Sequence, residues 1–396
     1  MTSYALINKD ALILIVRQRR ATNEYIQKKV SCSPSSLGKW LDPSSDALPT
    51  IRQAKKLADC LHVPFAGLYM NPEDIPKKEV PSLKNLRTVF GHSSDDDSAL
   101  NIATIDLLIE RDFLEEISDE IGLHLQYHYL HSPSGSNVVA WAENIRSQFD
   151  IDLTLQYKFA SSRKFYLYLR NQVESQGIFV QCFTGVPVES ARGIAIFDKK
   201  MPIIGINSDD RYPGKSFSII HELVHIFKNE SVICNDMFAT HTSSREEVFC
   251  NAVAGELLVP GKALDIIMRE GNYAYPYSLE CIASIAKRFS VSREVIARRL
   301  LDSSRIDETE YATLCDEFQR QLELEKEKQR EEQKNRKSVG LPVSLKAVDR
   351  TSPSICRALY YAYMDESYSK KDIARHLNID QRHVDRFLAE VSQWSR

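Results

Sequence analysis

Two histidines separated by three residues form the clearest chemical motif of the sequence, His221-Glu222-Leu223-Val224-His225. In a helix, residues four apart lie one above the other, so both imidazoles can reach a single metal ion. Glu222 then lies beside that face, where its carboxylate can take a proton from water held at the metal. The pattern predicts a zinc site with its own general base. The alternative is a pair of core histidines satisfied by hydrogen bonds, so the motif needs support from its surroundings.

A catalytic zinc site needs a third protein ligand. The segment 245–258 predicts a helix downstream of the motif, and it carries Glu246 and Glu247 near its start. Small residues later in this segment allow a second helix to approach closely, as two helices that share an ion must. A carboxylate near the start of the helix can supply the third bond and leave one position open for water and substrate.

The segments before the motif alternate between strand and helix patterns. Three short apolar segments predict strands, namely Gly177–Phe183, Gly193–Phe197 and Pro202–Ile206. Polar residues between the last two favour a hairpin turn. We expect the hairpin 193–207 to present an edge to an extended peptide substrate. Helical spacing then returns in Phe217–Lys228, which contains the motif.

Taken in this order, the blocks resemble the ImmA/IrrE family of metallopeptidases over about Leu169–Leu301. The resemblance rests on four blocks: Gly177-Ile178-Phe179-Val180, Pro202-Ile203-Ile204-Gly205-Ile206-Asn207, His221–His225, and Glu247-x-x-Cys250-Asn251 leading into 255–260. Gly255 and Val259 depart from the family pattern, which usually shows Ala and Met there. Several linked blocks are far more specific than an isolated H-E-x-x-H.

The resemblance implies a zincin-like minimal metallopeptidase core. It implies Zn²⁺ as cofactor, with His221, His225 and Glu247 as ligands and Glu246 as the alternative third ligand. Glu222 is implied as the catalytic base, which takes a proton from water during attack on a peptide carbonyl and passes it to the leaving amine.

Other polar residues and cysteines near the motif have candidate roles of their own. His241 and Tyr212 are candidates to stabilise the oxyanion, although surface or packing roles are the simpler interpretation. Cys234, His241 and Cys250 are not expected to bind a second metal, and Cys250 is expected to pack between the ligand helices.

The N-terminal residues 1–75 resemble phage-repressor-type helix-turn-helix domains. Thr22–Val30 and Ser33–Leu41 predict two short helices about a tight turn, with Ser33 as the cap of the second. The candidate DNA contacts are Ser33, Ser35, Ser36 and Lys39.

The resemblance at the N-terminus is incomplete. Gln27 stands where that fold usually has Ala, and Ser31 where it often has Gly. Leu41 stands where the fold commonly has a carboxylate. Residues 1–75 hold ten Lys and Arg against seven Asp and Glu, a modest positive charge for a protein that reads DNA. The alternative is a helical module that only docks the peptidase or a partner.

Composition excludes several classes of protein. The 396 residues are 43% hydrophobic and 27% charged with a net charge of −3, an ordinary balance that argues against collagen-like, disordered and membrane proteins. No apolar run approaches 18 residues, and the eight cysteines form no C-x-x-C pair. We therefore expect a cytoplasmic protein with reduced thiols and no membrane contact.

The expected fold is mainly α with a small β-sheet, an α+β arrangement with the peptidase core flanked by helical domains. The expected divisions are a helix-turn-helix domain (1–75), a linker and helical segment (76–150), the peptidase domain (151–305), a charged helix or spacer (306–340) and a small helical domain (341–396).

Function follows from the combined resemblances. We expect a zinc-dependent endopeptidase acting on a regulatory protein, a repressor or antitoxin, in phage, mobile-element or stress regulation, with double-stranded DNA as a possible second partner. The alternative is a non-enzymatic DNA-binding regulator or antirepressor whose zinc site is structural or sensory.

Overall fold

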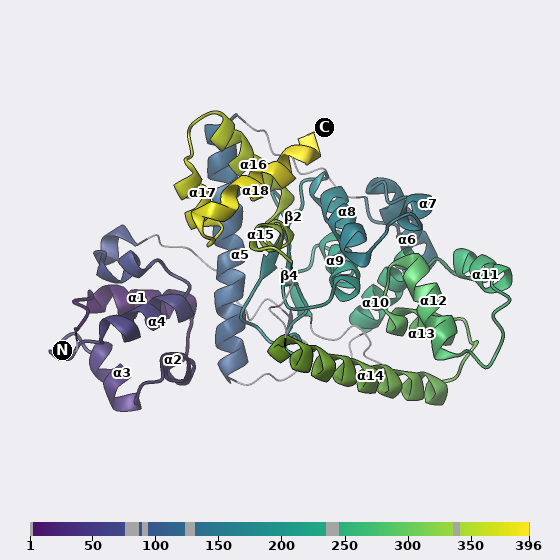
Figure 1. The fold of residues 1–396 in the computed structure, drawn as a ribbon, viewed down its shortest axis with the longest axis horizontal. Coiled ribbons are helices and arrows are strands. Elements are labelled where there is room, and N and C mark those ends of the chain that lie inside the picture. The colour runs from purple at the N-terminus through teal and green to yellow at the C-terminus, as the bar shows by residue number, and fades with distance from the viewer. Residues whose placement is uncertain are drawn as a thin grey trace.

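The structure is a computed structural model that describes residues 3–75, 87–88, 94–122, 131–234, 245–335 and 341–395. It is mainly helical around one small mixed sheet, so the predicted fold class is confirmed (Figure 1). The described helices gather into three groups: an N-terminal group, a central group on the sheet, and a C-terminal group.

The N-terminal group holds four helices and two short 3₁₀ turns. They are α1 (Lys9–Arg19), α2 (Asn23–Val30), α3 (Pro34–Trp40), α4 (Ile51–Cys60), η1 (Phe65–Tyr69) and η2 (Pro72–Asp74). The side chains of Asn8, Thr22, Ser33 and Thr50 each accept a hydrogen bond from a backbone N–H of the first turn, which is why the helices begin there.

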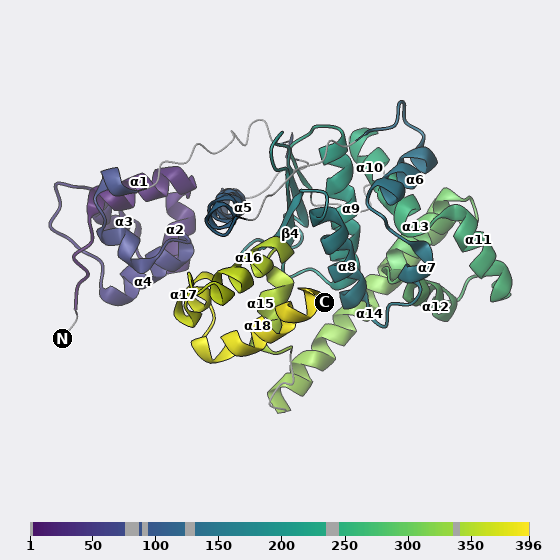
Figure 2. The same ribbon diagram turned by 90° about the horizontal axis from the view of Figure 1, so that it is seen from above.

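A long helix, α5 (Ser94–Glu120), lies between the N-terminal group and the sheet (Figures 1 and 2). This helix lies within the segment 76–150 that was expected to hold a linker and a helical part. Arg19 of α1 donates to Asp106 of α5 over 2.9 Å and to the backbone oxygen of His62 over 2.9 Å. The contact with Asp106 ties α5 to the N-terminal helices.

The sheet has the strand order β1-β5-β3-β4-β2. Its strands are β1 (Arg87–Thr88), β2 (Phe179–Phe183), β3 (Gly193–Ile196), β4 (Ile203–Asn207) and β5 (Val232–Cys234). Strand β3 is antiparallel to both β4 and β5, whereas β2 pairs with β4, and β1 with β5, in parallel. The predicted hairpin forms as β3 and β4.

The expectation that this hairpin presents a free edge is wrong. Strand β3 pairs with β5 on its other side, and β4 pairs with β2. Both hairpin strands are therefore interior, and their backbone groups are committed to neighbouring strands.

The two faces of the sheet are covered by different helices, and alternate residues of each strand point to each face. Ile194 and Ile203 belong to the core that includes α5, whereas Ala195 and Ile204 belong to the core built around α8 and α9. Gly205 allows the close approach of α5, since a Cβ there would lie 2.4 Å from Leu107 Cδ1.

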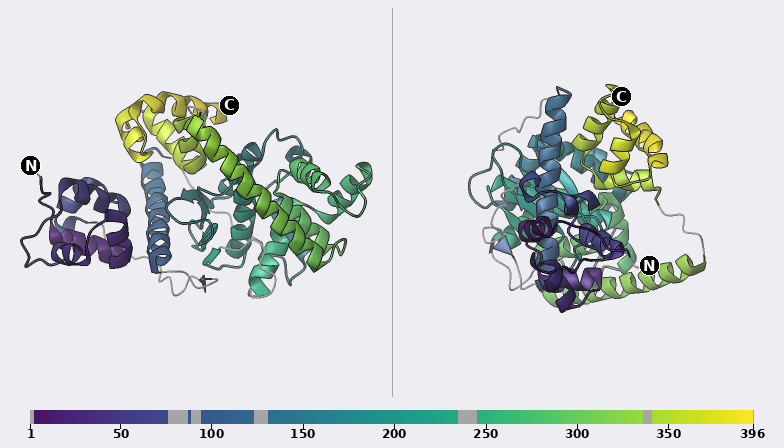
Figure 3. Two further views of the ribbon diagram at one scale, coloured as in Figure 1. Left: turned by 60° about the horizontal axis from the view of Figure 1, so that its bottom comes forward. Right: turned by 90° about the vertical axis from the view of Figure 1, so that its left-hand side faces the viewer.

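The central group of helices packs on the second face of the sheet through α8 and α9. They are α6 (Val138–Gln148), α7 (Leu153–Gln156), α8 (Ser162–Glu174), α9 (Tyr212–Phe227), α10 (Arg245–Leu258), α11 (Gly261–Glu270), α12 (Leu279–Phe289), α13 (Arg293–Asp302) and α14 (Glu308–Asn335). Helix α10 ends at Leu258 and α11 follows from Gly261, while α14 lies within the segment 306–340 that was expected to be a charged helix or spacer. The side chains of Tyr311 and Phe318 in the first half of α14 are buried, and the second half of the helix projects from the central group (Figure 3).

The C-terminal group packs against α5 and α8. It comprises α15 (Val343–Arg350), α16 (Pro353–Met364), α17 (Lys370–His376) and α18 (Val384–Ser392). The carboxylate of Glu174 on α8 accepts hydrogen bonds from Ser352 and Ser354 at the start of α16, over 2.6 and 2.7 Å. Within the described part of the chain, no helix combines the length and the apolar character needed to cross a membrane.

Candidate metal centre

Helix α9 carries the H-E-x-x-H motif through the middle of the central core. Every residue from Gly214 to Phe227 is buried, so the helix is covered on all sides by α8, α10 and the sheet. It begins at Tyr212 with Pro213 in its first turn, one turn earlier than predicted. The ligand-bearing face is consequently held by packing rather than by the local sequence alone.

The two imidazoles of the motif and one carboxylate converge at a single point. Nε2 of His221 lies 3.2 Å from Nε2 of His225, and the two carboxylate oxygens of Glu247 lie 3.2 Å and 3.4 Å from these nitrogens. Glu247 comes from the first turn of α10, which packs beside α9. The three donors face one another as they would around a shared ion.

The adjacent carboxylate, Glu246, points elsewhere. Its side chain is 37% exposed, and it lies 4.0 Å from the ammonium group of Lys228. Burial raises the pKa of Glu247, but hydrogen bonds to the two histidines and their charges outweigh it and hold that pKa well below its usual range. The geometry therefore brings Glu247, and not Glu246, to the imidazoles.

Glu222 is buried beside the three donors. It is 1% exposed, and its Oε2 has no hydrogen-bond partner among the described residues. Burial raises the pKa of Glu222 to about 7, while the charges of His221 and His225 act in the opposite direction. A desolvated carboxylate of this kind can hold or release a proton near neutral pH.

Strand β3 makes room for this carboxylate at Gly193. A Cβ at position 193 would lie 2.1 Å from Oε1 of Glu222, far inside contact distance. The absence of a side chain at the start of β3 is therefore what allows Glu222 to occupy its place.

A further carboxylate orients His225. Nδ1 of His225 lies 2.9 Å from Oε2 of Glu230, just beyond the end of α9, and Glu230 also contacts the ammonium of Lys228 over 3.1 Å. A carboxylate on the distal nitrogen directs the other nitrogen toward a metal and increases its basicity. Glu230 was missed from the sequence because the spacing rules for the motif end at the second histidine.

A thiol completes the cluster. Cys234, the last residue of β5, places its Sγ 3.6 Å from Nε2 of His225. Donor atoms of His221, His225, Cys234 and Glu247 all lie within 4.8 Å of one another, and all four residues are buried. Local sequence patterns did not predict that Cys234 would contact His225, because β5 is only three residues long and is placed by its pairing with β3. The cysteine thus belongs to the same cluster as the predicted ligands.

Comparison with known proteins agrees with this geometry. Residues 175–301 match the family model of the IrrE N-terminal-like domain, Peptidase M78. The match covers the sheet from β2 onward, α9 and α10, and so includes every donor of the cluster. It supports the resemblance to the ImmA/IrrE family, and it makes this part of the chain metallopeptidase-like. No curated protein matches the chain.

Tyr212, one of the two candidates to stabilise the oxyanion, is not part of the cluster. The Tyr212 hydroxyl donates to the carboxylate of Asp349 in the C-terminal group, and burial together with this contact raises its pKa. Because its hydroxyl is bonded to Asp349, Tyr212 is not available as an oxyanion donor. The other candidate, His241, lies outside the described residues.

The four residues singled out for DNA contact lie on or next to α3. Ser33, Ser35 and Lys39 are exposed and Ser36 is half-buried, while Trp40 turns inward. The Ser33 hydroxyl accepts a hydrogen bond from the backbone N–H of Ser36, as a helix cap should. Ser31 adopts a left-handed conformation with φ 62°, which explains why glycine suits this turn.

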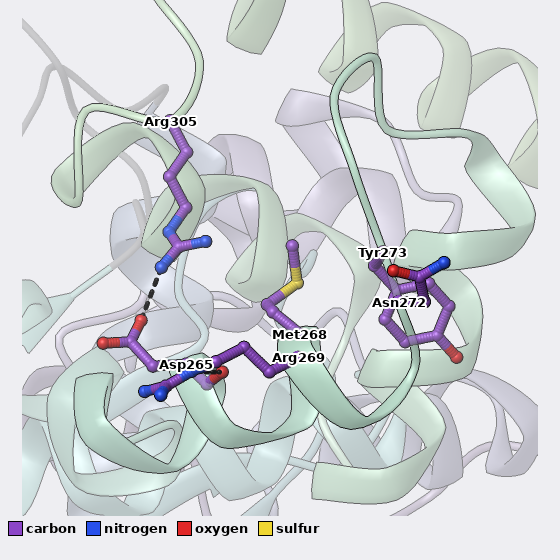
Figure 4. Close-up of a pocket in the computed structure, with 6 residues that line it drawn as sticks. All are labelled: Asp265, Met268, Arg269, Asn272, Tyr273 and Arg305. Atoms are coloured by element: carbon purple, nitrogen blue, oxygen red, sulfur yellow. Dashed lines mark hydrogen bonds and ion pairs between the residues drawn. The ribbon is translucent and has the colours of Figure 1, made fainter.

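A separate pocket of about 350 Å³ lies between α11 and the loop after α13 (Figure 4). Asp265 and Arg305 form an ion pair across it, and Tyr273 closes one side. None of its lining residues belongs to the metal cluster, and the pocket has no constellation of groups suited to hydrolysis.

Proposed function

We propose that the chain is a zinc-dependent endopeptidase that cleaves a regulatory protein of the repressor or antitoxin type. The observation that carries this proposal is the convergence of His221, His225 and Glu247 beside the buried carboxylate of Glu222. Two imidazoles and one carboxylate form the donor set of hydrolytic zinc sites, which leave the fourth position open.

The spacing of the donors supports zinc as the ion. Bonds of about 2.0–2.2 Å at tetrahedral angles place two nitrogen or oxygen donors roughly 3.4 Å apart. The corresponding separations here are 3.2, 3.2 and 3.4 Å. The three side chains therefore fit a tetrahedral ion with little rearrangement.

Each residue of the site has a defined task in this proposal. Zinc, when bound, lowers the pKa of water toward neutrality and polarises the peptide carbonyl. Glu222 takes a proton from the attacking water and delivers it to the leaving amine, for which a pKa near 7 is well suited. Glu230 orients His225, and Gly193 leaves space for Glu222.

The N-terminal helices support a regulatory substrate. Helices α2 and α3 meet at a tight turn with the exposed face of α3 outward, an arrangement typical of DNA-binding helix-turn-helix units. We propose that Ser33, Ser35, Ser36 and Lys39 contact double-stranded DNA, which would bring the peptidase to regulators bound nearby.

One observation favours a second candidate, a non-enzymatic regulator with a sensory or structural zinc site. Structural zinc sites are closed by four protein ligands, and Cys234 supplies a fourth donor here. The two candidates differ in whether Glu222 matters once the metal is bound.

The test uses Glu222→Gln in the full chain, both alone and combined with Cys234→Ala, which removes the fourth donor. We expect one bound zinc per chain in every variant by mass spectrometry of metals. We expect peptide cleavage, measured on a proteome-derived peptide library, to fall about 10²–10⁴-fold whenever Glu222 is replaced. Equal cleavage patterns with and without Glu222 in both backgrounds would favour the regulator.

A further inference from the structure

The fourth donor of the cluster stands where a hydrolytic site needs its water. That water must touch both the metal and the general base. The Cys234 thiol lies at this position: its Sγ is 3.6 Å from Nε2 of His225, and it is close enough to the carboxylate of Glu222 to lower the pKa of that group.

The distance from this thiol to the imidazole fits direct coordination. A zinc–sulfur bond of about 2.3 Å and a zinc–nitrogen bond of about 2.0–2.1 Å at a tetrahedral angle separate the two donors by roughly 3.5–3.6 Å. The observed separation is 3.6 Å. His221 and Glu247 complete a set of four donors within 4.8 Å of one another.

The backbone holds Cys234 in this place. It pairs with Gly193 across β5 and β3, and its carbonyl oxygen accepts from the backbone N–H of Arg192 over 2.8 Å. Gly193 is also the residue that accommodates Glu222. The same pair of strands therefore positions both the general base and the thiol.

The site is also closed to large molecules in this conformation. Each residue of the site is at most 4% exposed, namely His221, Glu222, His225, Cys234 and Glu247. A peptide carbonyl cannot reach the donors while they are covered to this extent.

We propose that the thiolate of Cys234 is the fourth metal ligand of the resting protein and keeps the site latent by excluding water. Coordination releases the thiol proton to solvent and displaces one water from the ion; opening reverses both changes. This inference rests on the metal site of the proposed function and adds a form of regulation to it.

A matched control is available in Cys250. It is fully buried and also contacts His225, but on the opposite side: its Sγ lies 3.8 Å from Nδ1, the nitrogen that faces Glu230. It comes from α10 and is not one of the four clustered donors. Replacement of Cys250 therefore tests for the general effect of removing a buried thiol beside this histidine.

The first measurement uses the full chain loaded with Co²⁺ in place of zinc. Thiolate ligation produces a near-ultraviolet charge-transfer band, which reports the ligand without any substrate. We expect this band in the wild type and in Cys250→Ala, and its loss in Cys234→Ala with one cobalt per chain retained. A wild-type cobalt protein without the band, or a band that survives Cys234→Ala, would overturn the proposal.

The second measurement tests exclusion with acetohydroxamate, a small metal-binding probe, followed by the visible cobalt spectrum. In the wild type, the probe can bind only to molecules in which the thiolate is off the metal. If these are under a tenth of the population, Cys234→Ala should bind the probe at least about tenfold more tightly than the wild type. Equal affinities would show that the thiol does not compete for the fourth position.

The two proposals fail in different ways. Absence of bound metal in the wild type and in both cysteine variants would contradict the peptidase proposal itself. Bound metal without the thiolate band would contradict only the role of Cys234 and leave a three-ligand site for hydrolysis.

Discussion

At the scale of single residues, the cluster depends on groups outside the set of candidate ligands. Glu230 holds Nδ1 of His225 over 2.9 Å and is itself held by Lys228. Hydrogen bonds and charges from these two residues outweigh its partial burial and lower the pKa of Glu230, so it presents a carboxylate to the imidazole at neutral pH. The orientation of one ligand is thus set by a residue outside the motif.

This arrangement leads to a prediction for metal affinity. Glu230→Gln removes the negative charge behind His225, which should weaken zinc binding about 10–100-fold. Competition with a chromophoric chelator on the full chain measures the dissociation constant directly.

Glu246→Gln is the matched control, because it also removes a carboxylate near Lys228 but lies away from the imidazoles. It should leave the zinc affinity unchanged. A larger loss at Glu246 than at Glu230 would contradict the assignment of both residues.

At the scale of elements, the contact between β3 and α9 decides where the base lies. Gly193→Ala would introduce a Cβ 2.1 Å from Oε1 of Glu222, so the carboxylate must move although it is buried on all sides. We expect one zinc per chain but a loss of cleavage approaching that of Glu222→Gln, measured on the same peptide library with Cys234→Ala as the parent.

Gly38→Ala provides the control for this change. Gly38 lies in α3, and a Cβ there has no atom within 4 Å, so cleavage and metal content should both be preserved. Full activity in Gly193→Ala would show that Glu222 does not need its observed position.

The elements also show how far the sequence could predict this site. Helices α9 and α10 were predictable because H-E-x-x-H spacing and apolar periodicity are local properties, and the helix expected at 245–258 has those bounds. Glu247 followed only through family resemblance, since a helix alone does not distinguish it from Glu246. The distinction comes from how α10 packs on α9.

The contribution of β5 could not be predicted in the same way. A segment of three residues, Val232–Cys234, has too few positions for a strand pattern, and its place between β1 and β3 depends on residues far away in the chain. This one strand makes β3 interior, which overturned the free-edge expectation, and it also delivers the Cys234 thiol. Both differences from the sequence prediction have a single physical origin in non-local strand pairing.

At the scale of the whole molecule, the C-terminal group is anchored to the helices that support the metal centre. Arg170 on α8 donates to the backbone oxygens of Val348 and Asp349 over 2.9 and 2.8 Å. The Asp349 carboxylate in turn receives Arg163 of α8 and the hydroxyl of Tyr212 in the first turn of α9. The end of α15 is therefore joined to the start of the helix that carries the motif.

Asp349→Asn tests this connection. The carboxylate is 5% exposed and accepts from Arg163 over 2.8 and 2.6 Å, so loss of its charge should weaken the anchor by about 2 kcal/mol. Hydrogen exchange followed by mass spectrometry should show faster exchange in α15 and in the first turn of α9, with α1–α4 unchanged.

Asp385→Asn is the control, because that carboxylate is exposed on α18 and pairs only at the surface with Lys370, where an ion pair contributes little. Faster exchange confined to α15, with the start of α9 unaffected, would show that the C-terminal group docks on the central core without supporting the metal-binding helix.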